Sequence, residues 1–133
     1  MDVKIGKIMG IVRQVLGKQG GVEFAYIFGS TVIGNTNKES DVDIGVYLAS
    51  KDIITYFDIR LDLIRVLTQA LGKEADVVIL NRAAPFLRYV VIREGKLVFE
   101  RSEESRVNFE LKTLQEYYDY KPYLEKYYQR LIK

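Results

Sequence analysis

Two short polar motifs between Phe24 and Leu48 constrain this chain more than any other feature. An apolar run typical of a strand ends at Gly29-Ser30, and after ten further residues Asp41-Val42-Asp43 opens a second apolar run. Because successive side chains of a strand point to opposite faces, Asp41 and Asp43 are predicted to project together. The alternate positions of the second run are then expected to face a core: Val42, Ile44, Val46 and Leu48.

The residue types in these two motifs point to phosphate chemistry. Two neighbouring carboxylates repel each other in the absence of a cation. Mg²⁺ in particular binds such oxygen ligands together with substrate phosphates. The Gly29-Ser30 turn offers a hydroxyl and backbone N–H groups that can bind phosphate. The simpler alternative is a Gly-Ser turn followed by a solvated acidic strand start, which needs no ligand.

The spacing of Gly29-Ser30 and Asp41-Val42-Asp43 resembles the signature of the DNA polymerase beta-like nucleotidyltransferase superfamily. The short length and the lettering GSTVIGNTNKESDVDIGVYL are most similar to the minimal nucleotidyltransferases (MNT proteins), antitoxins found beside HEPN toxins. The resemblance implies an α+β nucleotidyltransferase fold, in which helices flank a mixed β-sheet and the C-terminal tail is helical. It also implies a Mg²⁺-dependent enzyme that transfers AMP from ATP to a tyrosine of a cognate HEPN toxin, with which it could form an oligomer.

The same resemblance assigns roles to individual residues. Asp41 and Asp43 would bind two Mg²⁺ ions, and Gly29 and Ser30 would hold the β- and γ-phosphates. The family carries a third carboxylate on the next core strand, and Asp76 in the run ADVVIL is the acidic residue suitably placed for it. There it would bind the catalytic ion and help to accept the proton of the acceptor hydroxyl. The alternative for Asp76 is a strand-end carboxylate in solvent or at a turn. Three basic residues are further candidates for phosphate contacts or simply surface residues: Lys38, Arg82 and Arg88.

Composition narrows the chemistry. The 133 residues are expected to form a single domain, with a core over about 22–100 and a tail over about 102–133. The chain contains no Cys and no His, so thiolate and imidazole chemistry are excluded. A net charge of +2 makes a nucleic-acid partner improbable, and the apolar runs are too short for a membrane span, which leaves the cytoplasm as the expected compartment.

The remaining elements follow from periodicity and turn residues. Strands are predicted over 22–28, 41–48 and 75–80, the last one central because it is apolar on both faces, and an edge strand over 96–100. Helices are predicted over 2–18, over 52–71 with Ser50 as its cap, and from Asn81 as a cap to Glu94, with Pro85 in its first turn. The helical stripe in 52–71 comprises Ile54, Phe57, Leu61, Ile64 and Leu71. Six residues are predicted to be buried: Ile44, Val46, Val78, Ile54, Leu61 and Ile64.

The tail is rich in tyrosine. Six of the 10 tyrosines of the chain lie between Tyr117 and Tyr128, on more than one helical face, and Pro122 is expected to kink the tail or to start a new helix there. Tyrosine is enriched at protein interfaces. We therefore expect the tail to bind a partner, with packing against the sheet as the equally weighted alternative.

Two other functions remain open at this point. One is nucleotidyl transfer to a small molecule such as an aminoglycoside, although such enzymes usually need an additional substrate domain. The other is a non-catalytic antitoxin that masks its partner through the tail. The three candidate carboxylates argue against the loss of catalysis.

Overall fold

The computed structural model describes residues 3–33 and 41–132, and it contains a mixed four-stranded sheet in the order β3-β2-β1-β4. The strands are β1 (Val22–Phe28), β2 (Val42–Leu48), β3 (Ala75–Ile79) and β4 (Lys96–Glu100). β1 lies antiparallel to both β2 and β4, and β2 lies parallel to β3. The mixed sheet flanked by helices predicted from the sequence is confirmed.

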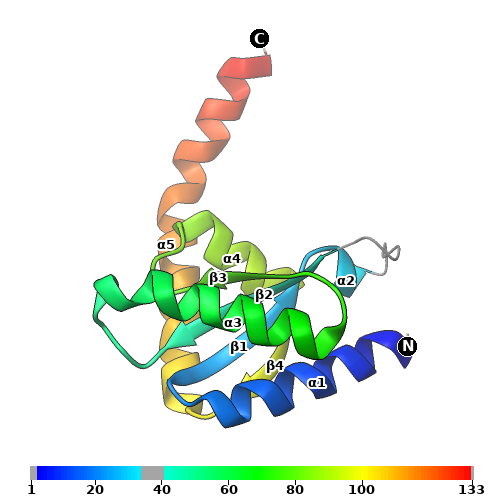
Figure 1. The fold of residues 1–133 in the computed structure, drawn as a ribbon. Helices are drawn as coiled ribbons and strands as arrows, with labels where there is room; N and C mark the ends of the chain where they lie inside the picture. Colours follow the sequence, from blue (N-terminus) through cyan, green and yellow to red (C-terminus); the bar gives the residue numbers. More distant parts are fainter. Residues whose placement is uncertain (1–2, 34–40, 133) are drawn as a thin grey trace.

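Helices cover both faces of this sheet (Figure 1). α1 (Val3–Gln19) and α3 (Tyr56–Leu71) pack on one face, whereas α4 (Pro85–Glu94) and the first part of α5 (Glu103–Ile132) pack on the other. The short α2 (Ser30–Ile33) follows β1, and a 3-10 turn, η1 (Ile53–Thr55), precedes α3. The basic candidate Lys38 lies outside the described residues.

The core has two parts, one on each side of the sheet. The larger part contains the even-numbered residues of β2 named above, all of them buried, together with residues of α1 and α3: Ile8, Val12, Leu16, Leu63 and Leu67. The smaller part lies under α4 and α5 and is built from Phe24, Tyr26, Leu80, Val91 and Phe109. The alternation predicted for β2 is therefore confirmed. Full burial of each such aliphatic or aromatic side chain stabilises the fold by roughly 1.5–3 kcal/mol.

β3 is an edge strand, so the prediction that it would be central is wrong. The strand is apolar on both faces because helices cover both faces of the sheet, and this pattern carries no information about its lateral neighbours. Val78 is only partly buried, while Val77 on the opposite face is fully buried.

The face of α3 that packs into the core is not the one predicted from the sequence. Ile54 and Leu61, which we expected in the core, are 87% and 46% exposed, and Ile64 is only partly buried. The helix carries a second apolar stripe that includes Tyr56, Leu63 and Leu67, and this stripe packs against the sheet and α1. The predicted Ser50 cap is also wrong, since Asp52 accepts a hydrogen bond from the Ile54 N–H at 3.1 Å and begins η1.

Asn81 joins two strand ends and does not cap a helix. Its side chain accepts a hydrogen bond from the Leu48 N–H at 2.8 Å and donates one to the Leu48 carbonyl at 3.0 Å. α4 begins at Pro85 after Ala84, and it ends before Gly95 as predicted. Asn81 thus ties the end of β2 to the segment that leaves β3.

α5 is one continuous helix through Pro122, so no new helix starts there. Its second half extends away from the body of the molecule (Figure 1, orange to red). Five tail tyrosines are 57–71% exposed, and they are Tyr118, Tyr120, Tyr123, Tyr127 and Tyr128. Tyr117 instead stacks on Tyr89 of α4, with ring centroids 3.5 Å apart. Among the described residues no helix is both long and apolar enough to cross a membrane.

Candidate active site

The end of β1 and the start of β2 bring the two sequence motifs together. Phe28 pairs with Asp43 in the antiparallel register, so Gly29 comes directly beside the Asp43 side chain. Gly29 has a φ of 78°, and a Cβ at this position would overlap the Asp43 carboxylate. A glycine is therefore required here for both conformation and space. Ser30 follows as the first residue of α2, whose turn is closed by a 3.1 Å hydrogen bond from the Val32 N–H to the Gly29 carbonyl.

Asp43 and Asp76 are neighbours across the parallel β2–β3 pair. They are register partners, and their side chains lie on the α4–α5 face of the sheet because the flanking residues on both strands point into the α1–α3 core. Asp41 lies immediately before β2 and is exposed. The structure thus brings Gly29, Asp43 and Asp76 to one end of the sheet, with Asp41 at its rim.

The surroundings of Asp43 disfavour the negatively charged form of its side chain. Partial burial raises the pKa of its carboxyl above the ordinary value, and the negative charges of Asp76 and Asp41 raise that pKa further. Burial first, and the neighbouring like charges second, thus disfavour the ionised form of Asp43. A divalent cation would relieve this repulsion, and the donors present are the oxygen ligands that Mg²⁺ prefers.

Arg60 is the residue of this site that sequence analysis missed. Its Nη2 lies 2.9 Å from Asp76 Oδ1, and its Nε donates a hydrogen bond of 2.6 Å to the Val77 carbonyl on the open edge of β3. The Val77 N–H also donates to Asp76 Oδ1, at 3.0 Å. The sequence pattern places Arg60 on the polar side of its helix, opposite the apolar stripe. The one available signal was its place on the helix directly before β3.

These contacts direct the Asp76 carboxylate toward Arg60. Within residues 3–33 and 41–132, no three acidic side chains lie close enough together to hold a metal ion. The expected convergence of Asp41, Asp43 and Asp76 into one ligand cluster is therefore not what the structure shows, although Asp43 and Asp76 are strand neighbours. Asp76 Oδ1 already accepts two hydrogen bonds, so Oδ2 is its oxygen available to a ligand.

Arg88, one of the basic residues considered for phosphate binding, lies away from the candidate active site. Arg88 donates a hydrogen bond of 2.7 Å to the Ala83 carbonyl and lies 3.8 Å from Glu116. It lines a pocket that includes Tyr47, farther along β2, and does not adjoin Gly29.

Comparisons with known proteins identify the family of this chain. The family described as polymerase beta, nucleotidyltransferase matches residues 11–104. The protein adenylyltransferase MntA of Shewanella oneidensis is 30% identical over 112 residues, which cover 84% of this chain and 75% of that protein.

Solved structures show the same fold. A toxin–antitoxin crystal structure with AMP-PNP contains a chain that superimposes with a TM-score of 0.73 at 25% identity, over 97% of this chain and 98% of that chain. A chain of the complex between a tri-AMPylated HEPN toxin of Shewanella oneidensis and its MNT antitoxin superimposes with a TM-score of 0.67 at 23% identity, over 98% of each chain. The chain described here belongs to the polymerase beta-type nucleotidyltransferases, in the group that includes the adenylyltransferase MntA.

Proposed function

We propose that this nucleotidyltransferase is the antitoxin of a toxin–antitoxin pair and transfers AMP from ATP to a tyrosine of a HEPN-family toxin in the cytoplasm. The observation that carries the proposal is the contact of Gly29 with Asp43 beside the register partner Asp76. The likeness to the adenylyltransferase MntA supports a protein acceptor. The toxin–antitoxin structure with AMP-PNP supports an adenine nucleotide donor.

In the proposed reaction the tyrosine oxygen attacks the α-phosphorus of ATP. A new O–P bond forms, the bond from that phosphorus to the bridging oxygen breaks, and pyrophosphate leaves with the electron pair. The phenolic proton passes to a carboxylate or to water, and Asp76 is our candidate acceptor. Gly29 and Ser30 would hold the β- and γ-phosphates, so that the α-phosphorus faces the acceptor.

Mg²⁺ fits the donor set of this site. Asp43 and Asp41 would hold the ions through carboxylate oxygens, and Asp76 would contribute Oδ2. When bound, the ions neutralise phosphate charge and lower the pKa of the attacking hydroxyl. The raised pKa of Asp43 supports this assignment, because partial burial and the charges of Asp76 and Asp41 disfavour its ionised form, and a bound cation would offset both effects.

The tail is proposed to bind the toxin. Its exposed tyrosines lie on the second half of α5, which extends away from the body of the molecule (Figure 1), and amphipathic aromatic side chains are common interface anchors. At the base of the tail an apolar hollow of about 200 Å³ could take a side chain of the partner. Six residues from α4, its N-terminal flank and α5 line this hollow: Ala84, Pro85, Phe86, Tyr117, Tyr120 and Leu124.

The decisive experiment is incubation of the purified chain with labelled ATP, Mg²⁺ and a HEPN-family protein encoded beside it, followed by mass spectrometry of that protein. We expect a mass increase of one or more AMP groups on tyrosine, and at least about 100-fold less of this product with Asp43→Asn. Binding of the toxin without any AMP transfer would contradict catalysis and favour a masking antitoxin. Transfer to a small molecule with an unmodified toxin would contradict the protein acceptor.

A further inference from the structure

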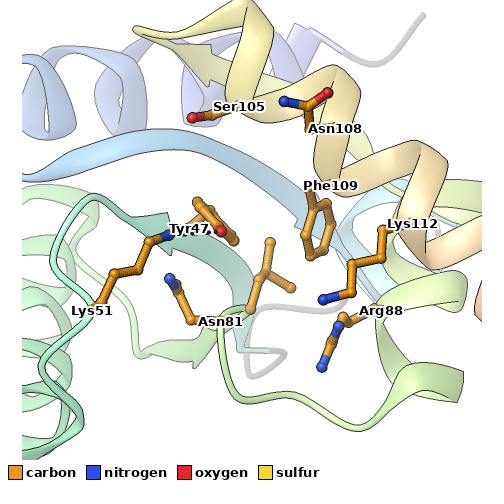
Figure 2. Close-up of a pocket in the computed structure, with 9 residues that line it drawn as sticks. Tyr47, Lys51, Asn81, Arg88, Ser105, Asn108, Phe109 and Lys112 are labelled. Atoms are coloured by element: carbon orange, nitrogen blue, oxygen red, sulfur yellow. Dashed lines mark hydrogen bonds between the residues drawn. The ribbon is translucent and has the colours of Figure 1, made fainter.

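A second pocket lies on the α4–α5 face of the sheet, at the end opposite to Gly29 and Asp43. Its volume is about 370 Å³, and it is enclosed by the ends of β2 and β3 and by α4 and α5 (Figure 2). Nine residues line it: Tyr47, Lys51, Leu80, Asn81, Arg88, Ser105, Asn108, Phe109 and Lys112.

The lining carries three positive charges and no negative one. Lys51 approaches from one side, and Arg88 and Lys112 lie together on the other side (Figure 2). These cations come from three different segments: the loop after β2, α4 and α5. In a chain with 20 basic and 18 acidic residues, such a local excess of one sign is a specific feature of this surface.

The cations are only partly neutralised by the protein itself. Lys51 donates to the Tyr47 hydroxyl at 2.9 Å, a neutral acceptor. Arg88 has Glu116 at 3.8 Å, longer than a well-formed hydrogen bond. Among the described residues Lys112 has no ion pair or side-chain hydrogen bond. Neighbouring cations of this kind repel each other unless an anion lies between them.

Neutral polar groups complete the lining. The side chains of Ser105 and Asn108 project from α5 at the rim (Figure 2). Within the part of the chain that the structure describes, neither side chain has a hydrogen-bond partner, so both can serve a ligand. Tyr47 is less available as a stacking surface, because Phe24 covers one of its faces with ring centroids 4.9 Å apart. The pocket therefore favours a polyanionic group over a planar base.

This pocket is separate from the candidate active site. Tyr47 follows Asp43 by four residues on β2, which corresponds to about 13 Å along a strand. Gly45 lies between them on the same face, and the space above it is filled by Leu80, whose side-chain atoms would lie 3.1–3.4 Å from a Cβ at Gly45. The Leu80 side chain therefore separates the pocket from the candidate active site.

We propose that this pocket binds the phosphate group of a small molecule, independently of nucleotidyl transfer at Asp43. A phosphate carries up to two negative charges and several acceptor oxygens, which match two or three cations with hydroxyl and amide donors at the rim. The source is either an inorganic phosphate, including pyrophosphate, or a nucleotide such as AMP. The proposal goes beyond the proposed function and does not rest on it.

The test is calorimetric titration of the full chain with phosphate, pyrophosphate and AMP in EDTA, where metal-dependent binding at Asp43 is absent. We expect saturable binding, weakened about tenfold by Lys112→Met and by Lys51→Met. Lys126→Met, an exposed lysine of the tail, should leave the affinity unchanged. Tighter binding of AMP than of phosphate would support the pocket with a nucleotide as its source, and equal binding would support it with inorganic phosphate.

Two results would overturn the proposal. One is no measurable binding of any of the three ligands at millimolar concentration. The other is equal weakening by Lys112→Met and Lys126→Met, which would indicate non-specific attraction to a basic surface. A thermal melt of each variant shows whether it is folded. Because Lys51 and Lys112 are exposed, we expect melts like that of the unmodified chain.

Discussion

Arg60 of α3 reaches the open edge of the sheet and binds Asp76, with 2.9 Å between Nη2 and Oδ1. The same guanidinium donates to the Val77 carbonyl, so one side chain covers the unpaired edge of β3 and holds the carboxylate beside Asp43. Arg60 therefore competes with any cation that would use Asp76 as a ligand.

Arg60→Gln should lower the Mg²⁺ concentration needed for half-maximal AMP transfer, because a positive charge next to Asp76 is removed. The pair is more than one-third exposed and screened by solvent, so stability should fall by only about 1 kcal/mol. A Mg²⁺ titration of transfer, together with a thermal melt, measures both effects. The matched control is Arg65→Gln, which breaks the exposed pair with Asp62 on the same helix. An unchanged or higher Mg²⁺ requirement in Arg60→Gln would argue against Asp76 as a ligand.

Gly29→Ala should abolish transfer and destabilise the protein. Left-handed backbone geometry costs a residue with a Cβ about 1–2 kcal/mol, and here the added methyl group also meets the Asp43 carboxylate. Gly21→Ala is the control, since Gly21 has a φ of 77° but open space around a Cβ. We expect Gly21→Ala to lose stability alone and to keep its activity. Equal activity in the two variants would show that the contact with Asp43 is unimportant.

Asp43→Asn should reduce transfer by about 100-fold or more while the fold persists. The pKa of Asp43 is raised in the folded state, so the folded chain binds this proton more tightly than the unfolded chain. The associated stability is present at acidic pH and is lost as the pH rises from the ordinary value of 3.8 through the folded pKa.

The free energy of unfolding of the unmodified chain should therefore fall, relative to Asp43→Asn, as the pH increases through this window in EDTA. Urea unfolding at several pH values measures the difference, and Asp119→Asn in the exposed tail is the control. A free energy of unfolding of the unmodified chain that instead rises relative to that of Asp43→Asn as the pH increases would contradict the assigned direction of the pKa shift.

The tail variant Tyr123→Ala with Tyr127→Ala should weaken toxin binding at least about tenfold and leave the melting temperature unchanged, because both side chains are exposed. A pull-down and a thermal melt provide the two measurements. Ile54→Ala removes an exposed apolar side chain of η1 and should have no effect on binding. Tyr117 is a poor choice for this test because it stacks on Tyr89 and belongs to the body of the fold. Undiminished binding of the double variant would exclude the tail as the interface.

Thr113→Val should stabilise the protein by up to about 1 kcal/mol. Thr113 is fully buried, and its hydroxyl has no hydrogen-bond partner among the described residues. Replacing an unsatisfied buried hydroxyl by a methyl group of the same shape removes a desolvation penalty. Urea unfolding measures the change. A loss of stability would instead show that the hydroxyl has a partner, such as a bound water.

The strands and the position of Asp43 were predictable because alternation along β2 fixes both its buried face and its polar face. The rotation of α3 was not predictable, since two apolar stripes lie on the same helix and only the packing against α1 and the sheet selects Leu63 over Leu61. The edge position of β3 was also not predictable. The hydrophobic pattern of a strand depends on what covers its two faces and not on which strands lie beside it. Arg60 was missed because a long side chain on a polar helical face can reach around such an edge.

The continuity of α5 has a geometric consequence for any protein bound along the tail. The 30 residues of this helix span about 45 Å, from Glu103 at the sheet to Ile132. The helix therefore determines how far from Asp43 a protein surface bound to the tail would lie. Inserting seven residues near Tyr123 would move the outer binding surface about 10 Å outward with little rotation, whereas inserting two would turn it to the opposite side. The length of α5 thus sets the distance between Asp43 and a protein surface bound at the tail. In such a complex, the reacting group of the bound protein would have to lie at that same distance from its contact with the tail.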